Sequence, residues 1–463
     1  MRYRTMIFAA VLCVIGFAVQ AKTALSWPTK TKQALLATAH ILKDNSPQYV
    51  MRAPHFMQWF DTGLIKADTL ANKAHNEAGY VYTLLFYTHG FNDAHVHIHP
   101  TPSERAQIPF RYAGMLLRKI NSHYVVYHRD ASWTTPPIGA ELLGCEGQPI
   151  QDVINQDIIP FYFAQGLQAS HNRAAHYVFF DGNPFRSYPK QCTFFVSGKK
   201  RHYQVKWHTL SNKERQKLMK FIEPQYDFRV EQFGQKGLWI SLPTYAPNAE
   251  LKALYTSLIQ AMPTYRQFNP IVLDVRGNDG GNSMWGRKIL GQLVGQAYLN
   301  TVVQQHDHSW EQYRVSPANI AKVKQFASAP FVKGMQQALA SKHQLYPYQA
   351  PPQSMFILSA KTQYHGHVYY LTDAHCISAC LDTADLIHWL PNGSIIGQTT
   401  GADTPYIEVN VLPLPGGAKL QYTMKYWHNR PRKTNQPYLP SKIYSGDIAD
   451  TRAVMRWVQQ IPQ

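Results

Sequence analysis

The stretch IVLDVRGNDGG, residues 271–281, decides the fold of the C-terminal half of this 463-residue chain. Its apolar first half is typical of a buried strand, and the glycines that follow favour a tight turn before a helix. A second unit, VYYLTDAHCISAC at residues 368–380, has the same order of buried strand, loop and helix. Strands that alternate with helices predict a mainly parallel sheet with its functional residues at the carboxyl ends of the strands.

Working outward from these units, we expect three regions in a multidomain protein of α+β and α/β class. Residues 211–463 form the α/β domain, with a polar, partly helical insertion at about 300–350. Residues 101–210 contain short strands and turns and form a β-rich module. Residues 22–100 form an N-terminal helical region that ends in a strand.

A run of histidines marks the end of the helical region. At Thr88 the helical pattern gives way to alternation, which predicts a strand with His95, His97 and His99 on one face. His-x-His occurs in zinc sites, so these side chains, with His89 nearby, allow a metal hydrolase as one interpretation. In a chain with 21 histidines the simpler interpretation is surface residues, and no metal or other cofactor is predicted.

The N-terminus predicts an exported bacterial protein, periplasmic or secreted. Arg2 and Arg4 precede an apolar run from Met6 to Val19, and Ala21 closes it, as in a signal peptide covering residues 1–21. An uncleaved membrane anchor is the alternative, although the apolar run is short for a spanning helix.

The charge limits the choice of partner. The chain has 46 Lys and Arg residues against 28 Asp and Glu residues, a formal net charge of +18. Such a surface is attracted to an anionic membrane or to cell-wall polymer. The cations are scattered rather than interleaved with stacking aromatic residues, so nucleic acid is not a predicted partner.

Four cysteines follow the predicted signal peptide: Cys145, Cys192, Cys376 and Cys380. An even number in an oxidising compartment permits two disulfides. Cys145 and Cys192 fall in the same β-rich module, and we predict that they pair. We expect Cys376 and Cys380, which flank Ser378, to be small buried residues, with a bridge between them as the alternative.

Ser378 stands where the second buried strand ends and a helix begins. A residue at such a point is presented at the edge of the sheet, and the N–H groups of a helix start suit a developing oxyanion. The Gly280-Gly281 turn ends the neighbouring unit and lets backbone donors approach a substrate closely. A helix N-cap and an ordinary turn are the simpler interpretations of these two features.

Four segments resemble peptidase family S41, the C-terminal processing (tail-specific) and tricorn-type serine peptidases. They follow the family's order over residues 236–463: VLDVRGNDGG (272–281), YLTDAHCISA (370–379), IIGQTTG (395–401) and LPLPGG (412–417). The module around residues 144–153 resembles the PDZ domain that many members carry.

The resemblance implies a ClpP/crotonase-like α/β domain that hydrolyses peptides or proteins. It implies Ser378 as nucleophile, with the N–H groups of Ala379 and of Gly280 or Gly281 as oxyanion donors. The chain departs from processing peptidases, which use a Ser-Lys dyad, because the lysine position counted from Gly397 is Asp403.

Tricorn-type members use an upstream histidine as general base instead. The segment GFNDAH, residues 90–95, resembles their D-x-H segment, so the resemblance implies that His95 is the base. A third member should orient the imidazole, and residues 430–441 contain no Asp or Glu. Asn435 is the candidate there, and Glu408 is the alternative. The missing lysine also allows a different function, a catalytically inactive S41-like protein that binds peptides or other ligands.

Overall fold

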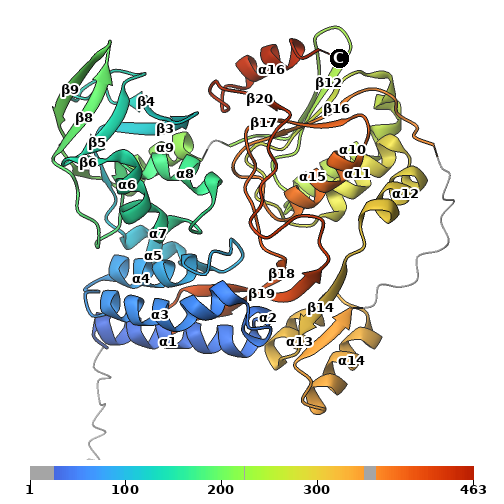
Figure 1. The fold of residues 1–463 in the computed structure, drawn as a ribbon, viewed down its shortest axis with the longest axis horizontal. Helices are drawn as coiled ribbons and strands as arrows, with labels where there is room; N and C mark the ends of the chain where they lie inside the picture. Colours follow the sequence, from blue (N-terminus) through green and yellow to red (C-terminus); the bar gives the residue numbers. More distant parts are fainter. Residues whose placement is uncertain (1–24, 224, 349–360, 463) are drawn as a thin grey trace, which may run out of the picture.

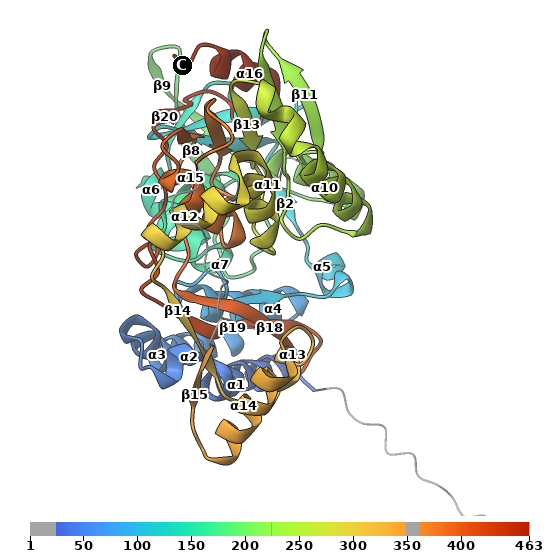
Figure 2. The same ribbon diagram turned by 90° about the vertical axis from the view of Figure 1, so that its right-hand side faces the viewer.

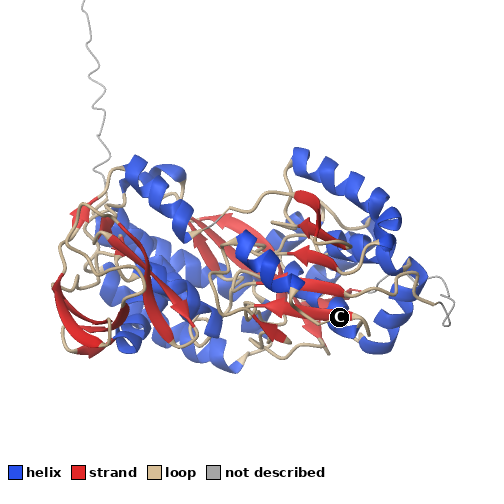
Figure 3. Ribbon diagram, turned by 90° about the horizontal axis from the view of Figure 1, so that it is seen from above, coloured by secondary structure: helices blue, strands red, loops and turns tan. Residues whose placement is uncertain are grey.

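The structure, a computed structural model, describes residues 25–223, 225–348 and 361–462. The predicted signal peptide lies outside these ranges. As predicted, the chain is a mixed α/β multidomain protein with a helical N-terminal region (Figures 1 and 3). None of the described helices is both long and apolar enough to span a membrane.

The sheet of the C-terminal domain has six strands in the order β11-β12-β13-β16-β17-β20. The strands from β12 to β20 are parallel, and β11 is antiparallel at the edge. The two units that decide the fold are neighbours, because β13 pairs with β16. The strands are β11 (Arg229–Phe233), β12 (Gly237–Ser241), β13 (Ile271–Asp274), β16 (Val368–Thr372), β17 (Gly393–Gly397) and β20 (Lys442–Ile443).

Helices cover both faces of this sheet, because successive side chains of its buried strands point to opposite sides. Leu273 and Tyr370 pack in the cluster formed by the helices of one face. Val272 and Leu371 pack on the other face against Val454 of α16. The helices are α10 (Ala249–Ala261), the short 3-10 helix Met262–Gln267, α11 (Met284–Val294), α12 (Gln296–His306), α15 (Ala379–Trp389) and α16 (Thr451–Gln459).

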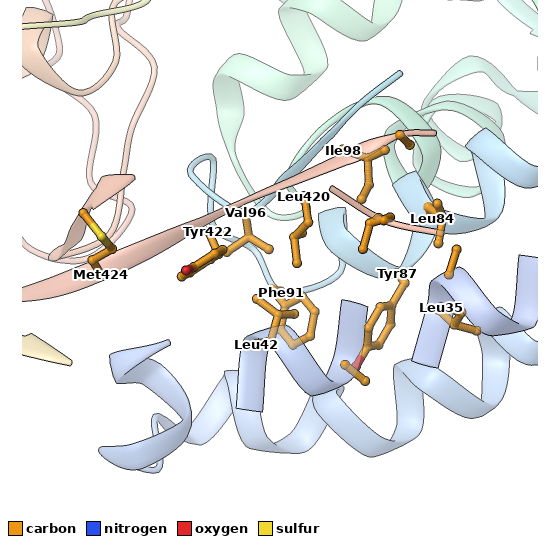
Figure 4. Close-up of a cluster of buried hydrophobic side chains, with 14 of the residues drawn as sticks. Leu35, Leu42, Leu84, Tyr87, Phe91, Val96, Ile98, Leu420, Tyr422 and Met424 are labelled. Carbon is orange, nitrogen blue, oxygen red and sulfur yellow. The ribbon is translucent and has the colours of Figure 1, made fainter. Parts of the chain in front are cut away.

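The N-terminal helices pack against a strand from the far end of the chain. Leu42 and Tyr87 of the helices share one buried cluster with Leu420, Tyr422 and Met424 of β19 (Figure 4). Burial of each large apolar side chain of this kind contributes about 1.5–3 kcal/mol. The helices are α1 (Trp27–Asn45), α2 (Pro47–Val50), α3 (Pro54–Ala71) and α4 (Glu77–His89).

A second sheet joins the N-terminal region to the C-terminal hairpin β18–β19 (Figure 2). Its strand β1 pairs antiparallel with β19, and His97 lies opposite Gln421. The predicted strand is shorter than expected, since it begins at His97 rather than His95. The carboxylate of Asp93 accepts the N–H of His95 at 2.9 Å, which holds the chain in a turn there. The strands are β1 (His97–His99), β14 (Trp310–Arg314), β15 (Leu345–Tyr348), β18 (Tyr406–Pro413) and β19 (Lys419–His428).

The region of the predicted insertion contains β14, α13 (Pro317–Val323), α14 (Ala329–Ala340) and β15, and its last residues lie outside the described ranges. Tyr313 and Met335 of this region pack in the same buried cluster as the N-terminal helices. It therefore extends the base formed by α1–α4 (Figure 1).

Between the N-terminal helices and the C-terminal domain lies the β-rich module. As predicted, a disulfide joins Cys145 to Cys192, which are opposed residues of β5 and β8. The likeness of the module to a PDZ domain stays a prediction. Its strands are β2 (Arg111–Tyr112), β3 (Met115–Ile120), β4 (His123–Arg129), β5 (Glu141–Cys145), β6 (Gln148–Pro149), β7 (Phe180–Asp181), β8 (Gln191–Val196), β9 (Lys199–Gln204) and β10 (His208–Thr209). Its helices and those that flank it are α5 (Pro102–Gln107), α6 (Ile150–Val153), the π-helix Ile154–Ile158, α7 (Ile159–Tyr162), α8 (Gln168–Ala174), the 3-10 helix Ala175–Tyr177 and α9 (Asn212–Ile222).

Candidate active site

Ser378 has an unusual backbone conformation at the start of helix α15. Its φ of 55° and ψ of −126° lie in a region that residues with a side chain rarely adopt. Holding a residue there costs about 1–3 kcal/mol, and such residues cluster at functional sites. Ser378 directly follows the loop after β16, so the conformation presents its hydroxyl at the carboxyl end of the parallel sheet, as in a nucleophile elbow.

A disulfide closes around this serine. The structure joins Cys376 to Cys380, two residues before and two residues after Ser378. Both cysteines are fully buried, as expected, but they are not free thiols, and the bridge that we gave as the alternative is present. The bridge restrains the loop that carries Ser378.

Gly280 packs directly against the serine. A Cβ atom at Gly280 would lie 2.8 Å from the Ser378 Cβ and 3.2 Å from the Ala379 nitrogen, and its φ is 99°. Gly281, with a φ of 131°, has the same restriction, since a Cβ there would lie 2.2 Å from the Tyr245 carbonyl carbon. The structure thus brings the two predicted loops together, and only glycine fits at their contact.

The backbone donors of this contact differ. The Gly280 N–H already donates to the side-chain oxygen of Asn278 at 2.9 Å. Within the described ranges, the N–H groups of Gly281 and Ala379 have no acceptor. Gly281 and Ala379 are therefore the donors that remain available to an oxyanion, whereas Gly280 supplies the close approach.

His95 is buried beside a carboxylate that the sequence analysis did not consider as the acid. Its Nδ1 lies 3.5 Å from the Asp93 Oδ1. The other Asp93 oxygen accepts hydrogen bonds from Gln48 Nε2 at 2.6 Å and from Thr404 Oγ1 at 2.9 Å. These contacts fix the carboxylate, which in turn orients the imidazole. The D-x-H spacing was itself the signal for Asp93.

The surroundings of His95 favour its protonated form. Burial alone would lower the pKa of His95, but the hydrogen bond and charge of Asp93, with the charges of Asp403 and Asp382, raise it above the ordinary 6.5. A base with such a pKa accepts a proton readily once it is itself deprotonated.

Asp403, at the position of the missing lysine, adjoins both the base and the nucleophile. Its carboxylate is buried and pairs with Arg430, at 2.9 Å from Nη1, and with Arg432, at 3.6 Å from Nη2. Burial raises the pKa of Asp403, while the charges of Arg432 and His95 and a hydrogen bond from the Ser378 N–H act in the opposite direction. An anion held by two arginines thus replaces a lysine base, and it links the two halves of the site.

One cavity of about 700 Å³ is lined by both halves. We call Gly280, Gly281, Ser378 and Ala379 the nucleophile wall, and Asp93, His95, His97 and His99 the histidine wall; every one of these residues lines the cavity. The structure thus gathers the predicted nucleophile, base and oxyanion donors around one space.

The two predicted third members differ from Asp93 in their contacts. Glu408 lines the cavity, but its carboxylate pairs with Lys425 at 3.8 Å. Asn435 donates its side-chain N–H to the Asn92 carbonyl at 2.9 Å and is not among the residues that line the cavity. Among the described residues neither contacts His95, so the geometry favours Asp93 as the orienting acid.

The remaining histidines bond to neighbours. His89 Nε2 lies 3.1 Å from His97 Nδ1, and His99 Nε2 lies 3.1 Å from the Gln421 side-chain oxygen. Burial lowers the pKa of His89 to about 3 and that of His97 well below its ordinary range, so both are neutral at pH 7. No group of three metal-ligating side chains in the described part of the chain could hold a metal ion.

With this geometry established, comparison with known proteins identifies the domain. The family model of peptidase family S41 matches residues 229–437, the segment that contains Ser378 and both glycines. This segment belongs to peptidase family S41. The S41 domain therefore has the fold and the family of a peptidase. Among curated protein sequences no match was found.

Solved structures extend the likeness beyond the S41 domain. Mature CPAF superposes with a TM-score of 0.61 at 12% sequence identity, over 94% of this chain and 97% of that chain. Mature CPAF complexed with lactacystin also gives a TM-score of 0.61 at 12% identity, over 93% of this chain and 99% of that chain. At this identity the likeness concerns the fold alone, and it covers the N-terminal helices and the module as well.

Proposed function

We propose that this chain is an exported serine peptidase in which Ser378 is the nucleophile and His95 the general base. The observation that carries the proposal is the cavity that both residues line, although they lie at opposite ends of the chain. The S41 family of the domain supports a peptidase, and the conformation of Ser378 supports nucleophilic chemistry at that residue.

The chemistry follows from the contacts of each residue. With Asp93 beside its Nδ1, His95 uses Nε2 to take the proton of the Ser378 hydroxyl as the oxygen attacks a peptide carbonyl. The N–H groups of Gly281 and Ala379 stabilise the negative oxygen of the tetrahedral intermediate. The protonated His95 then gives its proton to the leaving amine, and water hydrolyses the acyl-enzyme by the same route.

Export accounts for the redox state of the cysteines. The structure contains two disulfides, Cys145–Cys192 and Cys376–Cys380. Bonds of this kind persist in oxidising compartments and are rare in the cytosol. They support the signal peptide that the sequence predicts, and with it a periplasmic or secreted location.

Labelling with a serine-directed fluorophosphonate tests the proposal. We expect the purified protein to react at Ser378, to lose the label in Ser378→Ala, and to hydrolyse unfolded protein substrates such as casein. Lactacystin, which one CPAF structure contains, is a second probe for the same pocket.

A folded protein that shows neither labelling nor hydrolysis would instead support the binding-protein alternative. Peptide binding without turnover would be its positive sign. Activity that a chelator abolishes and zinc restores would support the metal hydrolase.

A further inference from the structure

The cavity contains two positive charges that the proposed chemistry does not use. Its lining includes the basic residues Arg105, Arg173 and Lys425. Lys425 is neutralised, because its Nζ lies 2.7 Å from a Glu311 carboxylate oxygen and 3.8 Å from one of Glu408. In the ranges that the structure describes, neither Arg105 nor Arg173 has a carboxylate within ion-pair distance.

These two arginines come from different elements and meet on the histidine wall. Arg105 belongs to α5 and Arg173 to α8. The guanidinium of Arg173 lies 4.9 Å from the centre of the Phe163 ring, a contact that restrains its plane. Both charges act on His97, whose pKa burial and these cations lower, so both lie close to that side chain.

Two carboxylates also line the cavity and must be included in its charge. Asp279 lies in the turn that leads to the nucleophile wall. Glu223, at the end of α9, is nearer the arginines, since it acts with them on the pKa of Tyr177, which burial raises. Glu223 forms no ion pair with either arginine, so the region on the histidine wall keeps an excess of positive charge.

We propose that Arg105 and Arg173 form an anion subsite that binds a carboxylate of the peptide substrate while its scissile carbonyl lies at Ser378. Planar guanidinium groups bind carboxylates with paired, charge-assisted hydrogen bonds. The carboxylate belongs to an Asp or Glu side chain or to the end of the peptide. The subsite rests on the proposed peptidase function and adds a preference for acidic over basic substrates.

Peptide binding to the full-length Ser378→Ala protein tests the subsite without turnover. The probes are fluorescein-labelled alanine–serine peptides with Glu at each position in turn, their Gln counterparts, and each with a free or an amidated carboxyl end. We expect at least one Glu peptide, or the free-acid form, to bind about tenfold more tightly than its neutral counterpart. Arg105→Gln and Arg173→Gln should each remove most of this difference, while Lys200→Gln on exposed strand β9 should leave it unchanged.

Two further variants make the result independent of folding losses. Glu223→Gln should strengthen binding of the acidic peptides, because it removes a like charge. Arg173→Glu should reverse the preference, so that Lys peptides bind more tightly than Glu peptides. Equal losses for acidic and neutral peptides, or no preference in the parent protein, would overturn the subsite.

Failure of the subsite and failure of the peptidase proposal give different results. If Ser378 hydrolyses peptides without regard to their charge, the subsite is wrong and the function stands. If the acidic peptides bind through both arginines and the protein containing Ser378 never cleaves them, the function is wrong and the subsite stands.

Discussion

The two walls of the cavity are built in different ways. The nucleophile wall consists of two loops that follow adjacent parallel strands, so each is fixed by residues near it in sequence. The histidine wall depends on β1, which pairs with β19 near the other end of the chain, and on α4 beneath it. Chemistry that needs both walls therefore depends on a local motif on one side and on tertiary structure on the other.

The largest effect should come from removing either reactive group. We expect Ser378→Ala and His95→Ala each to lower kcat/KM by about 10⁴–10⁶, because the two groups act as one unit. The double variant should lose little more than either alone. Steady-state hydrolysis of a fluorogenic peptide measures this, and full activity without His95 would show that the histidine wall is not catalytic.

Asp93→Asn should follow, with a loss of about 10²–10⁴ in kcat/KM, since the imidazole loses its orienting carboxylate. The base must be neutral, so activity should rise with pH through the pKa of His95, which its carboxylate neighbours hold above 6.5. In Asp93→Asn that limb of the pH profile should move to lower pH. Asn435→Ala and Glu408→Gln are the matched controls, and an unmoved limb in Asp93→Asn, with a shift in either control, would reassign the acid.

Gly280→Ala tests the contact between the two loops. Its new Cβ would press on the Ser378 Cβ at 2.8 Å, so we expect a loss of about 10²–10³ in kcat through a displaced nucleophile and oxyanion donors. Gly198→Ala is the control, because Gly198 also has a positive φ, of 80°, yet nothing lies within 4 Å of its added Cβ. That control should lose about 1 kcal/mol of stability at unchanged kcat. Equal kinetics in the two variants would show that the contact is not needed.

The two disulfides should separate stability from turnover, with the smallest effect on rate. Replacing Cys145 and Cys192 by serine removes a link that spans 47 residues, and we expect a lower melting temperature with kcat kept. Replacing Cys376 and Cys380, which are four residues apart, should lower kcat about tenfold, since Ser378 then leaves its strained conformation more often. Thermal unfolding and kinetics on both double variants measure this, and the reverse pattern would contradict it.

The difference between the walls also explains what could be predicted from the sequence. The strand-loop-helix patterns around residues 271–281 and 368–380 have a strong local signal, and their pairing follows from the rules of parallel sheets. Alternation placed His97 and His99 on one face, but it extended the strand to His95, because it does not register the hydrogen bond from the His95 N–H to Asp93.

The acid was missed for a related reason. We looked for it late in the chain, where the resemblance suggested it, whereas Asp93 stands two residues before the base it contacts. The contacts that fix Asp93 come from Gln48 and Thr404, and no local pattern in the sequence connects these three residues. The pairing of Cys145 with Cys192 was predictable because both lie in one module.

The pairing of β1 with β19 has a consequence for how the protein is made. A ribosome completes His95 early and Ser378 late, and the hairpin that docks the histidine wall follows later still. If the two residues act together as proposed, a growing chain contains no working peptidase until the hairpin has emerged and closed over β1. The cell is thereby protected from proteolysis by unfinished chains during synthesis and translocation, and activity becomes a property of the completed molecule.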